Sequence, residues 1–263
     1  MIREIKDKAI LYQRFKEDVY LFAYHIGDLD DFYFSNCTWF GLEENGQLKE
    51  VILLFRGLEI PTLLIFGSAE KIPFLIQQII KELPDRFYCH YQEDFHNYFQ
   101  SDYKMTFLGS HLKMKLQEEV ATLTLFDTTD TILLNQDDEQ EILSLYKTAY
   151  PESSFIPNML KTGKYYGIKS ENKIVSVAGV HVFSALYNIA VLGNITTNPN
   201  FRGRGLAKKC IIRLLKSFDG VVNQIGLNVK KDNDVALKLY QQLGFSIHSK
   251  YKEAYFERIS GKI

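Results

Sequence analysis

Apolar residues in the second half of the chain recur with the periods of strands and helices. Residues 187–197 are apolar through their centre and end before Pro199, which is typical of a buried strand. Residues 205–218 have apolar side chains along one face and Lys or Arg on the other, which predicts an amphipathic helix. The elements predicted for this half are strands at 165–169, 174–183, 187–197 and 224–229, helices at 205–218 and 234–243, and further strands up to residue 257.

The first half repeats this order of elements. Apolar runs at 39–43 and 48–56 flank Glu44-Asn45-Gly46, which is typical of a hairpin. The two halves are offset by roughly 125–140 residues, a spacing that indicates an internal duplication. The remaining elements predicted here are a strand at 60–66, a helix at 68–83, a strand at 87–91, a helix at 94–100 and a pair of strands from 103 to 116. We therefore expect an α+β (mixed α/β) chain of two similar domains, 1–120 and 121–263. The alternative is that residues 1–120 form an unrelated α+β cap.

A loop with two glycines joins the predicted strand 187–197 to the predicted helix 205–218. Unpaired N–H groups and the helix dipole make such a helix N-terminus a site for anions. The loop adds Arg202 and Arg204, and Lys208 and Lys209 follow in the first helical turn. Cations there oppose the helix dipole, and a bound polyanion would remove that conflict. We therefore predict a phosphate-binding loop.

The spacing of the glycines excludes two common phosphate loops. A Walker loop requires Lys and then Ser or Thr after the last glycine, where this chain has Leu206-Ala207. A dinucleotide-binding fingerprint requires three glycines, and this loop has two. What the loop does contain is Arg-x-x-Gly-x-Ala, formed by Arg202, Gly205 and Ala207. This pattern resembles the pyrophosphate loop of the GNAT superfamily, the acyl-CoA-dependent N-acetyltransferases.

A second segment strengthens the resemblance. Leu227-Asn228-Val229, then Asn233, Leu239-Tyr240 and Gly244-Phe245 resemble the second GNAT signature in order and spacing. Together the two signatures cover roughly residues 127–258 and are specific at the level of the family. The resemblance implies two tandem GNAT-like domains, each a mostly antiparallel mixed sheet flanked by helices. Residues 121–263 would form the acetyl-CoA-binding catalytic domain and residues 1–120 a degenerate copy.

The first copy lacks the features of the loop. Its equivalent turn is Gly67-Ser68-Ala69-Glu70, with no second glycine and no arginine. A carboxylate in the first helical turn would satisfy the helix dipole and repel a pyrophosphate. We therefore expect one coenzyme site, in the second copy.

The resemblance also assigns the coenzyme contacts. Backbone groups of Ile195 and Thr197 would bind the pantetheine arm as an added strand does. Asn228 and Asn233 would hydrogen-bond the same arm. The pyrophosphate would contact the loop and first helical turn, at Arg202, Gly203, Arg204, Gly205, Leu206 and Ala207.

The reaction implied is direct attack of an amine on the thioester. Tyr240 shares a helix face with Asn233 and would donate a proton to the departing thiolate. The fourth strand of the domain lacks the glutamate that some family members use as a base. His181 is the favoured base, with Tyr187 a second nearby candidate and Glu253 and His248 on later strands.

Composition excludes several other classes of function. A net charge of −1 gives no electrostatic case for nucleic acid. The three cysteines are scattered, which argues against a zinc site or a disulfide framework, so we expect no metal. No apolar run is long enough to span a membrane, and the charged N-terminus lacks a signal-peptide core. We therefore expect a cytoplasmic protein, monomeric or homodimeric.

Together these features predict an N-acetyltransferase that moves an acetyl group from acetyl-CoA to a primary amine of a small molecule. Two alternatives remain open. One is acyl transfer to an amino acid or a thiol. The other is a non-catalytic sensor that binds acyl-CoA.

Overall fold

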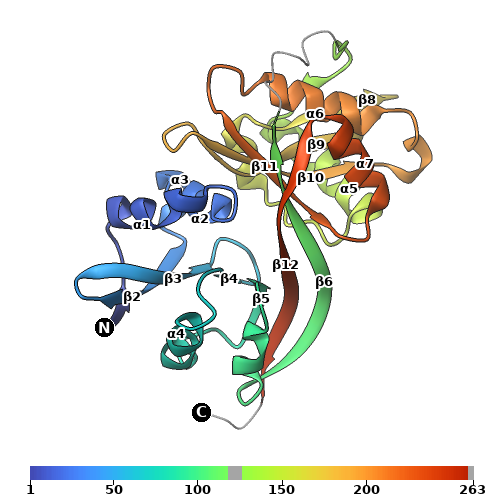
Figure 1. Ribbon diagram of the computed structural model, residues 1–263. Coiled ribbons are helices and arrows are strands. Elements are labelled where there is room, and N and C mark those ends of the chain that lie inside the picture. Colours follow the sequence, from blue (N-terminus) through green and yellow to red (C-terminus); the bar gives the residue numbers. More distant parts are fainter. Residues whose placement is uncertain (118–125, 260–263) are drawn as a thin grey trace. The chain divides into compact units, whose positions relative to one another are not determined.

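The computed structural model describes residues 1–117 and 126–259, which form two compact units (Figure 1). The first unit contains residues 1–113, 229–234 and 248–259. The second contains the described residues between 114 and 228, together with residues 235–247. The predicted domain boundary at 120/121 falls on residues 118–125, outside the described residues, so the division into 1–120 and 121–263 stays a prediction.

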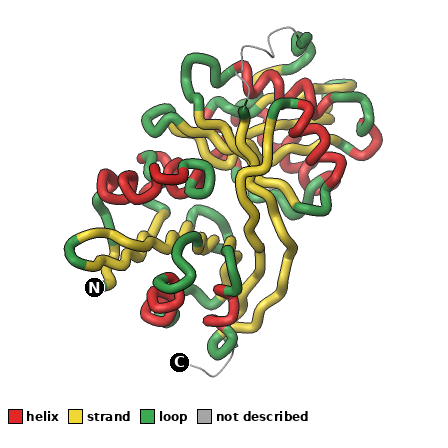
Figure 2. Tube along the Cα trace, in the orientation of Figure 1, coloured by secondary structure: helices red, strands yellow, loops and turns green. Residues whose placement is uncertain are grey.

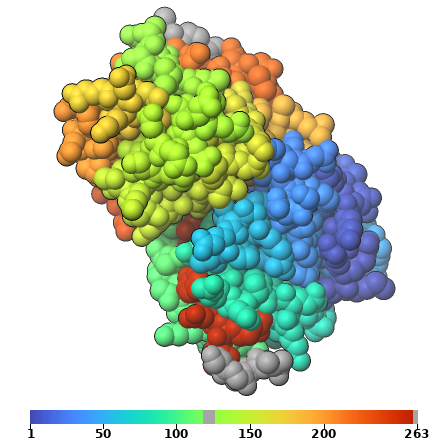
Figure 3. Space-filling model, turned by 180° about the vertical axis from the view of Figure 1, so that it is seen from behind, coloured from blue at the N-terminus to red at the C-terminus, as the bar shows by residue number. Residues whose placement is uncertain are grey.

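The first unit is a mixed sheet with helices packed against it. Its strands are β1 (Ile2–Glu4), β2 (Cys37–Glu44), β3 (Gln47–Phe55), β4 (Thr62–Ile65) and β5 (Arg86–Tyr91). Neighbouring strands in this series are antiparallel except β4 and β5, which are parallel. The helical segments are α1 (Lys8–Phe15), η1 (Lys16–Asp18), α2 (Ala23–Gly27), α3 (Asp31–Phe34), α4 (Ile72–Ile79) and η2 (Phe95–Phe99). The N-terminal part of this unit, drawn in dark blue, lies together on the face shown in Figure 3.

The second unit is also a mixed sheet, in the strand order β11-β10-β9-β8-β7 (Figure 2). Its strands are β7 (Ile132–Leu133), β8 (Tyr166–Ser170), β9 (Lys173–Ser184), β10 (Ile189–Thr197) and β11 (Gln224–Lys230). Its helical segments are η4 (Gln136–Asp138), α5 (Glu139–Ala149), η5 (Pro157–Thr162), η6 (Pro199–Phe201), α6 (Leu206–Lys216) and α7 (Asp234–Gln242). Both α5 and α6 pack against β9 and β10. On α6 the buried side chains recur with helical period, as predicted.

Two long strands contribute residues to both units. These are β6 (Tyr103–Leu116) and β12 (Phe245–Arg258). Within the first unit β12 is antiparallel to β5, with Glu253 opposite His90. The predicted pair of strands from 103 to 116 was wrong, because Gly109 takes a φ of 134° inside one continuous strand and the chain does not reverse there. The predicted strands up to residue 257 are likewise one strand.

Two helices predicted in the first half also differ from the structure. The helix predicted at 68–83 is α4, which is limited to Ile72–Ile79, with a proline at its N-terminus. The segment predicted as a helix at 94–100 is the 3-10 turn η2. Short polar stretches at both ends of an apolar run led us to predict helices that are longer than those in the structure.

A buried lysine lies in the core of the first unit. Lys113 on β6 is 3% exposed, and its Nζ is 4.7 to 5.2 Å from the ring centroids of Phe66, Tyr251 and Tyr24. Burial lowers the pKa of Lys113 to about 7, although the nearby carboxylates of Glu253 and Asp18 act in the opposite direction. Its ammonium is therefore held in the interior at a cost to stability below that pH.

Replacing this lysine should change how stability depends on pH. An unfolded lysine titrates near pH 10.4, so between about pH 7 and that value the unfolded chain binds more protons than the folded one. The free energy of unfolding should therefore rise with pH, by up to about 1.4 kcal/mol per pH unit. We expect Lys113→Met to lose this rise in urea unfolding at pH 7 and pH 9. Lys104→Met, at an exposed position of the same strand, is the control and should keep it. An unchanged slope in Lys113→Met would show that the lysine is not buried as described.

Candidate functional site

Strand β10 runs on past the point where its pairing with β11 ends. The parallel register runs from Ile189↔Gln224 to Leu192↔Leu227, whereas β10 continues to Thr197. The last five residues of β10 therefore lie beyond the paired part of the two strands. This is the opening in the sheet that the family resemblance places beside the pantetheine arm.

A backbone group of one predicted residue, Thr197, is turned toward that opening. Asn198 N donates to Val175 O at 2.8 Å, which fixes the hydrogen-bonding phase between the end of β10 and β9. Because N–H groups alternate in direction along a regular strand, that of Thr197 is directed away from β9, whereas Ile195 lies where the register between the two strands shifts. Thr197 is thus oriented as an added strand would require, and the role of Ile195 stays a prediction.

The loop after β10 has the backbone form of an anion site. Gly203 and Gly205 both have φ of 76°, in the left-handed region that glycine adopts without strain. Gly205 is the N-cap of α6, with no side chain capping the helix, so the N–H groups of Leu206 and Ala207 have no intrahelical partner. A Cβ built at either glycine would have nothing within 4 Å. The glycines therefore serve the backbone conformation and leave open space beside it.

The basic side chains of the loop are held partly by the protein itself. Arg202 Nε donates to Thr197 O at 3.2 Å, and Arg204 Nη2 donates to Asn200 O at 3.3 Å. Lys209 Nζ is 2.7 Å from Asp130 Oδ2. The conflict between Lys209 and the helix dipole is thus already relieved in part without a bound anion, by an aspartate that the sequence did not place there.

Tyr240, predicted as the proton donor, lies on α7 and is 7% exposed. Burial raises the pKa of its phenol, with a smaller contribution in the same direction from Tyr150. The hydroxyl therefore stays protonated throughout the physiological range, as a proton donor must.

His181, predicted as the base, is the extra residue of a bulge in β9. The register passes from Val191↔Val182 to Leu192↔Val180, so the shift between the two strands falls at His181. Its ring lies against Gly193 of β10, since a Cβ on that glycine would be 2.0 Å from His181 Cδ2. The bulge thus places the imidazole beside the unpaired part of β10.

The two predicted asparagines belong to different units. Asn228 lies on β11 in the second unit, directly after the last residue of that strand paired with β10. Asn233 lies in the segment 229–234 of the first unit, where its N–H donates to Lys230 O at 3.1 Å. The structure therefore brings Asn228 to the end of the β10–β11 pairing, and the role of Asn233 stays a prediction.

The corresponding turn of the first unit is filled from within. Glu50, 4% exposed, accepts a hydrogen bond from Ser68 N at 3.2 Å and pairs with Arg14 Nη2 at 2.9 Å. A Cβ on Gly67 would lie 2.3 Å from Glu50 Oε2, so the carboxylate occupies the inside of the turn. All four residues of β4 are paired with β5. The two strands therefore do not separate at this point. The carboxylate at the turn is that of Glu50, whereas that of Glu70 was expected from the sequence.

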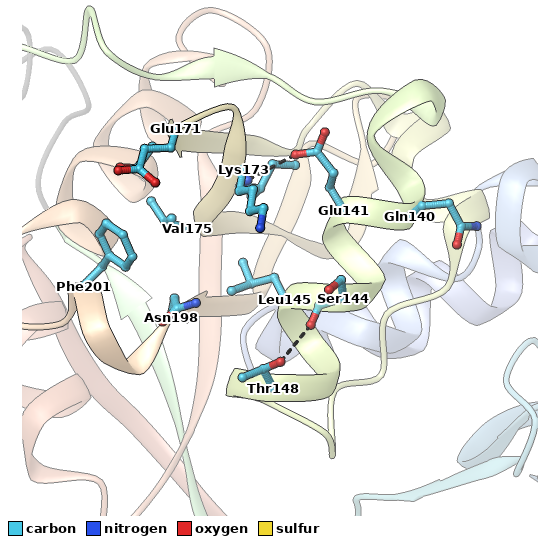
Figure 4. A pocket seen from close by; sticks show the side chains of 12 residues that line it. Gln140, Glu141, Ser144, Leu145, Thr148, Glu171, Lys173, Val175, Asn198 and Phe201 are labelled. Atoms are coloured by element: carbon cyan, nitrogen blue, oxygen red, sulfur yellow. Dashed lines mark hydrogen bonds between the residues drawn. The ribbon is translucent and has the colours of Figure 1, made fainter.

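A pocket of about 430 Å³ lies next to the loop in the second unit (Figure 4). Its walls are α5, the turn between β8 and β9, and residues Asn198 and Phe201. None of the predicted site residues lines it. Several of its polar atoms are bonded within the protein: Glu141 Oε2 accepts from Ile174 N at 3.2 Å, and Thr148 Oγ1 donates to Ser144 O at 3.2 Å. We therefore do not assign the chemistry to this pocket.

Two further features bear on the class of protein. In the part of the chain that the structure describes, no helix is long and apolar enough to cross a bilayer. Over residues 1–117 and 126–259, no three His, Cys, Asp or Glu side chains are grouped to hold a metal ion. The prediction that the protein needs no metal stays a prediction.

The fold and the loop define a mixed α/β protein in which β10 runs past its parallel neighbour and is followed by a glycine loop and the N-terminus of α6. Comparison with known proteins identifies the family of this part of the chain. Residues 131–245 match the acetyltransferase (GNAT) family, a range that includes every element from α5 to α7. The chain therefore carries a GNAT acetyltransferase domain, and acetyl-CoA is the co-substrate of that family.

One curated relative is the N-alpha-acetyltransferase RimI of Mycobacterium tuberculosis, which is 29% identical over 101 residues. The matched region is 36% of this chain and 61% of the relative, so the chain spans less than two thirds of that relative's length.

Solved structures extend the likeness to the whole chain. A Drosophila protein has a TM-score of 0.72 at 12% identity, with 97% of this chain and 98% of that protein covered. A tandem GNAT protein from the clavulanic acid biosynthesis pathway has a TM-score of 0.58 at 10% identity, with 100% and 99% covered. At these identities the likeness is one of fold. It confirms the predicted tandem GNAT architecture.

Proposed function

We propose that the second unit transfers an acetyl group from acetyl-CoA to a primary amine. One observation carries the proposal. At the end of β10 an unpaired strand edge runs directly into a helix N-terminus led by two left-handed glycines. A thioester joined through an extended pantetheine arm to a pyrophosphate has the same sequence of groups: amides that can pair with a strand, then a dianion.

The residues present fit that ligand. The N–H of Thr197 is directed toward the opening in the sheet, Ile195 lies two residues before it, and the two glycines of the loop have open space beside them. Arg202 and Arg204 are exposed, and their guanidinium groups bond to backbone carbonyls that phosphate oxygens can replace as acceptors. Asn228 stands at the branching point of β10 and β11 and would hydrogen-bond the arm.

The chemistry requires one bond to form and one to break. The neutral amine attacks the thioester carbon, the C–S bond breaks, and the leaving thiolate takes a proton from Tyr240. The amine proton passes to His181, and exchange with water restores both side chains. A tyrosine is a suitable donor because its hydroxyl is protonated at neutral pH and the thiolate is a good acceptor. Orientation of the two reactants would supply much of the remaining rate.

The acceptor is proposed to be a small molecule bearing a primary amine. A specific alternative is the α-amine of a polypeptide, because the curated relative is an N-alpha-acetyltransferase. Acyl transfer to an amino acid or thiol and a silent acyl-CoA sensor are the other proposals, and the protein would act as a monomer or homodimer.

Release of CoA thiol from acetyl-CoA tests these proposals. The acceptors would be a panel of small primary amines, free amino acids, a thiol, and short peptides with free or blocked N-termini. Turnover of small amines supports the main proposal. Turnover limited to peptides with a free N-terminus moves the acceptor to polypeptides. Tight acetyl-CoA binding by calorimetry without turnover of any acceptor would favour the sensor, and absence of binding would contradict all of them.

A further inference from the structure

The end of β10 is shaped by a second bulge, in β10 itself. Its register passes from Gly193↔Gly179 to Thr196↔Val177, so Asn194 and Ile195 together stand opposite one residue of β9. Asn194 has a φ of 54°, an uncommon conformation for a residue other than glycine, although asparagine tolerates it. The bulge therefore determines the direction in which the backbone N–H of Ile195 is oriented.

A buried network of tyrosines holds Asn194 in this conformation. Tyr146 on α5 donates its hydroxyl proton to the Asn194 carbonyl at 2.6 Å. Tyr165 receives a hydrogen bond from Asn194 Nδ2 at 2.9 Å and donates to Val180 O at 2.8 Å. All three network residues, Tyr146, Tyr165 and Asn194, are at most 3% exposed. Both the backbone and the side chain of Asn194 are therefore tied to neighbouring elements.

Tyr165 accepts from Asn194 in each arrangement of this network. Its single hydroxyl proton goes to Val180 O at 2.8 Å or to Met159 Sδ at 3.3 Å, and in both cases its oxygen accepts from the amide nitrogen of Asn194. Tyr146 is buried, and burial raises the pKa of its phenol well above the ordinary value, so it remains a donor at every physiological pH. The hydrogen bond from Tyr146 to Asn194 O is therefore kept near neutrality.

The aromatic rings also explain the glycines that flank the bulge. A Cβ on Gly179 would lie 2.1 Å from the Tyr165 ring, so that ring rests on the β9 backbone opposite Gly193. The ring of His181 covers Gly193 in the same manner. The rings of Tyr165 and of His181, the proposed base, therefore pack against Gly179 and Gly193, which are opposite each other in the bulged region.

We propose that Tyr146 and Tyr165 are positioning residues for acetyl transfer: they hold Asn194 left-handed, which keeps the Ile195 N–H directed at the thioester carbonyl. The proposal rests on the function proposed above. Neither tyrosine touches a reacting atom. Their effect is on the direction of one backbone donor, and such a donor stabilises the developing oxyanion only when it is aligned in advance.

Tyr146→Phe tests the role of the clamp on the backbone. The variant keeps the ring and removes the donor to Asn194 O. We expect kcat to fall about tenfold, with KM for acetyl-CoA within about twofold of the parent, because alignment and not binding is lost. The infrared stretch of a ¹³C-labelled acetyl-CoA carbonyl, shifted down in the bound parent by the hydrogen bond, should shift less in the variant. Tyr166→Phe, at a buried tyrosine outside the network, is the control and should behave as the parent.

A substitution pair at the bulge gives an independent test that does not depend on Tyr146→Phe folding. Asn194→Ala removes the tether and puts a side chain that disfavours positive φ at this position, so kcat and the carbonyl shift should fall. Asn194→Gly also removes the tether but adopts positive φ readily, so it should recover much of both. A side chain that acted directly on substrate, or that served only packing, would not be rescued by glycine.

The outcomes separate this inference from the proposed function. If the parent binds acetyl-CoA but its carbonyl stretch is unshifted, or if Asn194→Ala and Asn194→Gly are equally impaired, the positioning role is wrong and the coenzyme site stands. Parental kcat and carbonyl shift in Tyr146→Phe would also overturn it. If the parent does not bind acetyl-CoA, the proposed function fails and this inference fails with it.

Discussion

Gly205→Glu is expected to lower the affinity for CoA at least about 100-fold, or about 2.7 kcal/mol, while the protein stays folded. The residue caps α6, where the unpaired N–H groups of the first turn face open space. A glutamate there places a carboxylate at the position proposed for the pyrophosphate and repels it. The backbone cost of a non-glycine residue at φ of 76°, about 1–2 kcal/mol, acts on folding and is well below the roughly 5–15 kcal/mol that stabilises a domain, so the variant should stay folded. Isothermal titration calorimetry with CoA measures the loss.

The chain offers a matched control for this substitution. Gly220 has a φ of 67°, has nothing within 4 Å of a built Cβ, and lies past the other end of α6. Gly220→Glu therefore introduces the same charge and similar strain away from the loop, and CoA should bind it as it binds the parent. Equal affinities of Gly205→Glu and the parent would reject the loop as the pyrophosphate site.

Tyr240→Phe is expected to lower turnover about 100-fold with less than a twofold change in CoA affinity, since a positioned general acid contributes about 10²–10⁴. The phenol is buried on α7, and burial raises its pKa, so the parent should not lose activity at alkaline pH through ionisation of this group. The measurement is kcat for the best acceptor, with calorimetry for the coenzyme.

Tyr166→Phe serves as the control here too. Tyr166 is 7% exposed, as is Tyr240, but its ring packs under Arg213 of α6. Loss of that hydroxyl should leave turnover unchanged. If Tyr240→Phe turns over as fast as the parent, Tyr240 is a packing residue and another group protonates the thiolate.

The loop was the part of the site most open to prediction from sequence. Its chemistry is local: two glycines, two arginines and a helix start lie within a few residues of one another, from Arg202 to Ala207. The structure gives both glycines the left-handed conformation and starts α6 at Leu206. Local backbone preferences decide such features, and those preferences are written in residue types.

The bulges in β9 and β10 were not predicted. Both lie inside runs with the composition of plain strands, and a bulge depends on pairing with a neighbour that the sequence alone does not align. One signal was present. Gly193-Asn194 interrupts an otherwise apolar strand, and asparagine is among the few residues that tolerate positive φ.

Contacts between distant residues were equally hidden. Glu50, on β3, accepts a hydrogen bond from Ser68 N at the turn of the first unit, although the two residues are 18 positions apart in the sequence. The pairing of β12 with β5 joins residues such as Glu253 and His90. Neither could be read from periodicity, because period reports which face of an element is buried and not which element buries it.

The position of β12 has a practical consequence for anyone who divides this protein. The strand that pairs with β5 comes from the last residues of the chain, so a fragment that ends at residue 120 lacks it. Such a fragment would expose the backbone donors and acceptors of β5 to other molecules, and exposed strand edges promote aggregation. The two halves should be produced together, as one polypeptide or as co-expressed pieces that can complement each other, before either is assayed.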